Sequence, residues 1–178
     1  MLKKMFLASI ILLFISQFNY AQNQKKFSGF GIAFKYSNKY VLNSGVAKEG
    51  YKFVNLQRQG SNITIQLFPV VLTKSLRKIY LNAFEGELKS GGNALSATSQ
   101  GESNFTINDP TTKGGNIKVK AILYQTNFTV SENKVLVKTK IFFFSYRKKG
   151  YVVAFSYLPA LNHEKEFNLI KNSFTISK

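Results

Sequence analysis

Hydrophobic and polar residues alternate along several short segments of the chain, which is the pattern of half-buried β-strands. The first segment covers residues 29–36 (GFGIAFKY), and the turn-rich residues 38–45 follow it. Residues 51–57 and 63–68 alternate again, and the RQGSN between them contains the glycine and asparagine that hairpin turns favour. We expect these last two strands to pair antiparallel.

A helical pattern follows at residues 72–88 (LTKSLRKIYLNAFEGEL). Its apolar residues recur at spacings of three and four, as on one face of a helix. Thr73 is a suitable N-cap, and the Ser-Gly-Gly that starts at Ser90 is typical of a helix end. The apolar face is formed by Leu76, Ile79, Tyr80, Ala83 and Phe84.

Residues 93–116 are mostly polar and predict a long excursion over the surface, with FTI as its only strand-like piece. The chain after them is rich in β-branched and aromatic residues, which favour strands. Within it, residues 140–146 (KIFFFSY) lack alternation, as in a central strand buried on both faces. The strands of the expected antiparallel meander cover residues 117–125, 128–130, 135–146 and 151–157, with SENK and RKKG as tight connections between the last three.

The end of the chain predicts a helix that docks on the sheet. Pro159 ends the last strand, and Asn162 is a suitable N-cap. Glu164 and Glu166 follow in the first turn, where the helix dipole favours carboxylates. The apolar residues that we expect to anchor this helix are Phe167, Ile170 and Phe174.

The N-terminus has the three-part pattern of a secretory signal peptide: Lys3 and Lys4, an apolar stretch at residues 6–15, and a polar transition to Ala21. A transmembrane anchor is the alternative, but the apolar stretch would span roughly half of a ~30 Å hydrocarbon layer. We therefore expect a signal peptide at residues 1–21 and a single domain at 22–178. Its destination would be the periplasm or the extracellular space of a bacterium.

The order of these elements and the end of the chain resemble the PsbP-like superfamily. The start GFGIAFKYSNKY resembles the family pattern F-x-I-x-Y-P-x-x-W. The terminal F-x-x-I-x-x-S-F is matched by Phe167, Ile170, Ser173 and Phe174. The resemblance implies an α+β fold, with an antiparallel β-sheet flanked by helices in an α/β/α sandwich. It also implies a binding or assembly protein, because the family has no shared catalytic constellation.

The formal net charge of +17 favours anionic partners, such as membrane surfaces, acidic polysaccharides, nucleic acid or acidic proteins. A lysine-rich genome composition is the alternative explanation for this excess of basic residues. Two clusters could bind an anion, one at the start of the first predicted helix and one at the RKKG hairpin tip; solvated surface is the alternative for both. Their residues are Lys74, Arg77 and Lys78, and Arg147, Lys148 and Lys149.

The chain is poor in catalytic groups. It has one histidine, His163, one aspartate, Asp109, and no cysteine, which excludes the usual histidine- and thiolate-rich metal sites. A serine-histidine-acid triad would have to use His163, which we expect to be solvated at a helix start. Carboxylates two residues apart on a helix point in different directions and do not converge on one substrate atom. Such pairs are Glu85 with Glu87 and Glu164 with Glu166.

We therefore predict a secreted or periplasmic, non-catalytic binding or assembly protein without metal or cofactor. Its expected partner is an anionic surface or an envelope protein, and we do not expect nucleic acid to be the partner. Two alternatives stay open. One is a hydrolase with an unconventional site around His163, and the other is a binder of a small apolar ligand held between sheet and helix.

Overall fold

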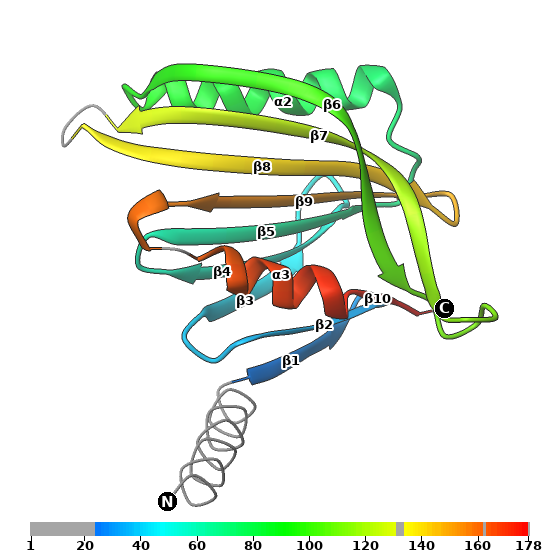
Figure 1. Cartoon of the computed structure of the whole chain (residues 1–178). Coiled ribbons are helices and arrows are strands. Elements are labelled where there is room, and N and C mark those ends of the chain that lie inside the picture. Colours follow the sequence, from blue (N-terminus) through cyan, green and yellow to red (C-terminus); the bar gives the residue numbers. More distant parts are fainter. Residues whose placement is uncertain (1–23, 131–133, 162, 178) are drawn as a thin grey trace, which may run out of the picture.

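The computed structural model describes residues 24–130, 134–161 and 163–177. Within them, ten strands form one curled sheet in the order β1-β2-β10-β6-β7-β8-β9-β5-β4-β3 (Figure 1). The predicted signal peptide and the predicted N-cap Asn162 lie outside the described residues. The strands are β1 (Gln24–Gly29), β2 (Ile32–Ser37), β3 (Val41–Val46), β4 (Lys52–Arg58), β5 (Ser61–Phe68), β6 (Ala94–Asn108), β7 (Asn116–Val130), β8 (Val135–Tyr146), β9 (Lys149–Tyr157) and β10 (Thr175–Ile176). The helices are α2 (Lys74–Ser90), the short η1 (Pro159–Leu161) and α3 (Glu164–Ser173).

The central strand β8 is buried on both faces, as predicted. Phe142 and Phe144 belong to the larger hydrophobic core, which includes the buried face of α3. Ile141 and Phe143 point the other way, into a smaller cluster beneath α2. Because successive side chains of a strand alternate between faces, the two helices lie on opposite sides of the sheet.

Helix α3 docks on the sheet through the three anchors predicted from the sequence. Phe167, Ile170 and Phe174 are all buried. The Phe167 ring stacks on Phe155 with ring centroids 4.6 Å apart, and the Phe174 ring meets Phe105 at 5.5 Å. The chain end is therefore a core element of the fold, and its last residues add β10 between β2 and β6.

Helix α2 has the predicted caps but covers its side of the sheet incompletely. The Thr73 side chain accepts a hydrogen bond from the Leu76 amide at 3.2 Å, and the helix ends at Gly91. None of its residues is buried, and Ile79, predicted for its core face, is 64% exposed. Over the described residues the fold is mostly β-sheet with two α-helices, of which only α3 contributes buried residues. No helix of the described ranges is long and apolar enough to cross a membrane.

The surface excursion predicted for residues 93–116 is wrong, because most of it forms β6. This strand pairs antiparallel with β7 from Ala94↔Thr129 to Asn108↔Asn116. Most of its side chains before Phe105 are exposed, so this part of the strand is held mainly by backbone hydrogen bonds and needs no apolar alternation. The predicted FTI piece is its buried part, with Phe105 and Ile107 in the core. The break predicted near residue 126 is also absent, since β7 continues through Thr126 and pairs there with Thr139.

Two further expectations in the first half are wrong. Residues 29–36 are not one strand but contain the end of β1, a two-residue turn and most of β2. The turn has φ of 56° at Phe30 and 80° at Gly31. Positive φ at both positions is the geometry of a type I′ turn, which phenylalanine rarely adopts. Part of the turn-rich 38–45 is the edge strand β3, which pairs with β4. The β4–β5 pairing and the β7–β8–β9 meander are confirmed.

Candidate ligand-binding site

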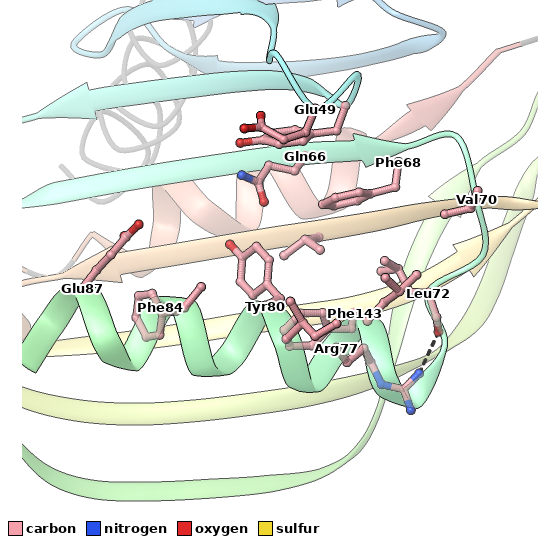
Figure 2. A pocket seen from close by; sticks show the side chains of 15 residues that line it. Glu49, Gln66, Phe68, Val70, Leu72, Arg77, Tyr80, Phe84, Glu87 and Phe143 are labelled. Carbon is pink, nitrogen blue, oxygen red and sulfur yellow. Dashed lines mark hydrogen bonds between the residues drawn. The ribbon is translucent and has the colours of Figure 1, made fainter.

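A cavity of about 450 Å³ lies between α2 and the sheet (Figure 2). Its floor is one cross-strand row, in which Gln66 of β5 pairs with Val152 of β9, which in turn pairs with Phe143 of β8. Its walls are mainly apolar and aromatic side chains. The volume falls in the range of about 300–1,000 Å³ that is typical of small-molecule sites. The other lining residues are Glu49, Tyr51, Phe68, Val70, Leu72, Leu76, Arg77, Ile79, Tyr80, Ala83, Phe84 and Glu87.

The cavity exists because α2 is attached to the sheet at separate points. Near its start, the Leu72 amide donates a hydrogen bond to the Ser145 hydroxyl at 3.0 Å. In the middle of the helix, the Tyr80 ring meets Phe143 edge-on with centroids 5.4 Å apart. Further along, the Tyr124 hydroxyl donates to the Glu85 carboxylate. These contacts fix the position of the helix and leave the space between them open.

Several polar groups face this mainly apolar cavity. The Gln66 Oε1 atom is shielded from solvent and has no hydrogen-bond partner among the described residues. An unpaired buried polar atom costs roughly 1–3 kcal/mol, which a ligand that donates a hydrogen bond to it would offset. Burial raises the pKa of Tyr80 to about 12, with smaller contributions from Tyr51 and Glu87. At neutral pH its hydroxyl is therefore protonated and is a potential hydrogen-bond donor.

The mouth of the cavity carries exposed aliphatic side chains. Val70 is 51% exposed and Ile79 is 64% exposed, and Leu76 lies beside them on α2. Val71, next to Val70 in the chain, is exposed as well. Contiguous exposed apolar surface on a soluble protein marks a place where another apolar group binds. The rim thus extends the apolar character of the cavity to its opening.

In each of the two predicted basic clusters, the arginine is engaged within the protein. Arg77 lines the cavity and donates to the Leu72 carbonyl at 2.9 Å. Arg147 pairs with the buried carboxylate of Asp109 at 2.6 Å. The salt bridges of the described residues include none of the other four, which are Lys74, Lys78, Lys148 and Lys149.

The fold brings the two clusters to the same end of the sheet (Figure 1). The chain between β5 and α2 lies directly against the β8–β9 hairpin. At Gly150 a Cβ atom would come within 2.5 Å of Leu72 and 2.7 Å of the Val70 carbonyl oxygen, so the contact depends on glycine. The start of α2 and the hairpin tip are therefore neighbours.

The expectation that His163 is solvated is wrong. It is 3% exposed, and its Nδ1 lies 3.1 Å from Glu166 Oε2, while its Nε2 has no partner among the described residues. Glu166 also pairs with Arg58. Glu164 points elsewhere, to Lys140 and Tyr157, so this carboxylate pair diverges as predicted.

Glu85 and Glu87 also diverge, since the first binds Tyr124 and the second lines the cavity. The described residues contain no group of three histidine, cysteine or acidic side chains placed to hold a metal ion. Sequence reasoning missed Glu49 and Gln66, which come from separate segments and meet α2 only in the fold. The sequence held one signal, the polar residue Gln66 within a strand. A polar side chain there indicates an exposed position, and in the structure it lies on the strand face that α2 partly covers.

Comparisons with known proteins give similarity in structure only. No protein-family model matches the sequence. No curated protein matches it either. The solution structure of cyanobacterial PsbP (CyanoP) from Synechocystis is 12% identical, with a TM-score of 0.48 over 86% of this chain and 92% of that one. The Saccharomyces cerevisiae Ran-binding protein Mog1p is 11% identical, with a TM-score of 0.49 over 86% and 95% of the two chains.

A Bacteroides thetaiotaomicron crystal structure is 15% identical, with a TM-score of 0.46 over 88% of this chain. This chain spans about half of that protein, with 49% covered. At these identities the similarity concerns the fold and does not extend to partners or activity. A PsbP protein is thus among the solved structures similar to this chain.

Proposed function

We propose that this is a non-catalytic binding protein that holds a small, largely apolar ligand between α2 and the sheet. The observation that carries the proposal is the cavity of about 450 Å³ beneath a helix that buries none of its own residues. Apolar floor residues such as Val152 and Phe143 give a ligand surface to cover, and burial of apolar area yields about 25 cal/mol per Å². The exposed rim at Val70 and Ile79 gives it a way in.

A matched pair of helix substitutions tests the proposal. Ala83 lines the cavity, whereas its neighbour Asn82 does not line it and is exposed. We expect saturable binding of the neutral fluorescent probe N-phenyl-1-naphthylamine to the wild-type protein. Ala83→Trp should weaken it about tenfold or more by filling the cavity, and Asn82→Trp should leave it unchanged. Absent binding, or equal binding by both variants, would count against the site.

Binding of an anionic surface or an envelope protein is a second candidate function. It is supported by the net charge of +17 and by the four lysines at one end of the sheet that lack salt bridges among the described residues. Replacing Lys148 and Lys149 by Gln should weaken binding to heparin and to anionic vesicles in low salt. The same change at Lys25 and Lys26, on the far strand β1, is the control for net charge. Equal losses of binding in the two double variants would mean that the protein is attracted to these anions only through its net charge, without a specific site.

The non-catalytic part of the proposal rests on the surroundings of His163. Its Nδ1 meets a carboxylate, Glu166, as a hydrolase would need, but its Nε2 meets no hydroxyl among the described residues. Its side chain is enclosed, so substrate would have no direct access to it. Hydrolase activity lost in a folded His163→Ala protein would favour the enzymatic alternative.

A further inference from the structure

Apart from Arg77, the polar groups of the cavity lie at one side of it. Figure 2 shows the polar ends of Glu49, Gln66 and Tyr80 near one another, away from Phe68 and Val70. Tyr51 and Glu87 line the cavity as well, and the Glu87 carboxylate lies on the side of the Tyr80 hydroxyl, away from Phe68 and Val70 (Figure 2). The cavity is therefore amphipathic, with an apolar end and a polar end.

Negative charge and hydrogen-bond acceptors dominate the polar end. Glu49 and Glu87 contribute carboxylates, and Gln66 contributes the unpaired Oε1. The guanidinium of Arg77 does not neutralise them, because it donates to the Leu72 carbonyl at the apolar end (Figure 2). A ligand group placed here meets acceptors that lack a positive partner.

These carboxylates are unusual in this protein, where 25 basic residues stand against 8 acidic ones. Among the described residues, Asp109, Glu164 and Glu166 form salt bridges, and Glu85 accepts a hydrogen bond from Tyr124. No hydrogen bond or salt bridge of the described residues engages the side-chain carboxylates of the remaining three, Glu49, Glu87 and Glu102. Two of these three line the same cavity.

We infer that the ligand is a cationic amphiphile, with an apolar body beneath α2 and a protonated amine directed at Glu49, Glu87 and Gln66. This inference rests on the proposed function, because it assigns a ligand class to the same cavity. An ammonium group has three donors and no acceptor, which matches a polar end rich in acceptors. The rings of Tyr51 and Tyr80 also line the cavity, and aromatic faces attract cations. A fatty acid would bring its negative charge to two carboxylates.

Three probes with the same apolar chain separate the contributions of head and body: decylamine, decanol and decanoate, titrated calorimetrically at neutral pH and low salt. We expect decylamine to bind about tenfold more tightly than decanol, and decanoate to bind most weakly. Because Glu49 and Glu87 are exposed, each change to Gln should weaken decylamine binding by about threefold, and both together by about tenfold. Decanol binding should not change.

The control is Glu102→Gln, which removes the same charge from β6 outside the cavity and should change nothing. If decanol or decanoate binds more tightly than decylamine, and this binding is lost in Ala83→Trp, the ligand is not a cationic amphiphile. The cavity would then still be the binding site. Decylamine binding that is indifferent to Glu49 and Glu87 would overturn the cationic class as well. If neither the three probes nor the naphthylamine bind, the proposed function itself fails.

Discussion

Lys140 donates a hydrogen bond to Glu164 at 2.6 Å and so ties the central strand β8 to the first turn of α3. The Tyr157 hydroxyl donates to the same carboxylate oxygen at 2.9 Å. The hydrogen bond from Lys140, then the one from Tyr157, lowers the pKa of Glu164 below its ordinary value of 4.5. The last helix is thus held on the sheet by a charged contact at its start and by apolar anchors further along.

This contact predicts a pH-dependent contribution to stability. Because the folded-state pKa of Glu164 lies below the unfolded one, its contribution is complete above the unfolded pKa and is lost as the pH falls through the folded pKa. The carboxylate is 47% exposed, so the contribution is about 0.2–1 kcal/mol. Glu164→Gln should lower the free energy of unfolding by this amount at neutral pH and by nothing in strong acid. Denaturant titrations at both pH values measure it, with Glu102→Gln as the control.

Removal of a core anchor should have a much larger effect. Phe174 is buried against Phe105, Phe144 and Phe34. Phe174→Ala leaves a cavity among these rings and should lower the free energy of unfolding by about 3–5 kcal/mol. Leu161→Ala, which truncates an exposed side chain, should change it little. An unaltered melting temperature for Phe174→Ala would mean that the chain end does not dock.

The elements that the sequence predicted well are those whose side chains decide their structure. The helix capped by Thr73 and the anchors Phe167 and Ile170 have local signals that tertiary packing reinforces. Apart from FTI, strand β6 gave no such signal, because its other side chains are mostly polar and exposed and its pairing with β7 depends mainly on backbone hydrogen bonds. The β1–β2 turn was hidden for a similar reason, since Phe30 is a poor marker of positive φ.

The candidate site could not be predicted because its residues are distant in the sequence. Gln66 and Phe143 come together only through the pairing of β5 with β9 and of β9 with β8. Glu49 comes from the connection between β3 and β4, which the pairing of β4 with β5 brings to the same place. The spacing of Ile79 on the helix predicted a core position, yet the helix is held away from the sheet and leaves it exposed. A periodic pattern shows which face of a helix is apolar, and it does not show whether that face is filled.

The predicted leader can be tested on the exported protein. The pattern from Lys3 to Ala21 predicts cleavage after Ala21, so the mature chain should begin at Gln22. Intact-mass measurement of the protein from periplasmic and culture fractions of a bacterial host gives the answer. A retained N-terminus in the membrane fraction would instead support the anchor alternative.

A glycine in β9 links the basic end of the sheet to the cavity and supplies the sharpest test of how the site is built. At Gly150 a Cβ would stand 2.5 Å from Leu72, a cavity residue, and 2.7 Å from the backbone oxygen of Val70. A backbone atom cannot move aside as a flexible side chain can, so Gly150→Ala must displace the connection from β5 to α2.

We expect this substitution to lower the free energy of unfolding by about 1–3 kcal/mol, the usual effect of overpacking. Because Val70 and Leu72 move with the connection, binding of the naphthylamine probe should weaken in protein that is still folded. Gly101→Ala in β6 is the control, since no atom lies within 4 Å of the Cβ it adds. Probe affinity that survives in a destabilised Gly150→Ala protein would show that the cavity does not depend on this contact.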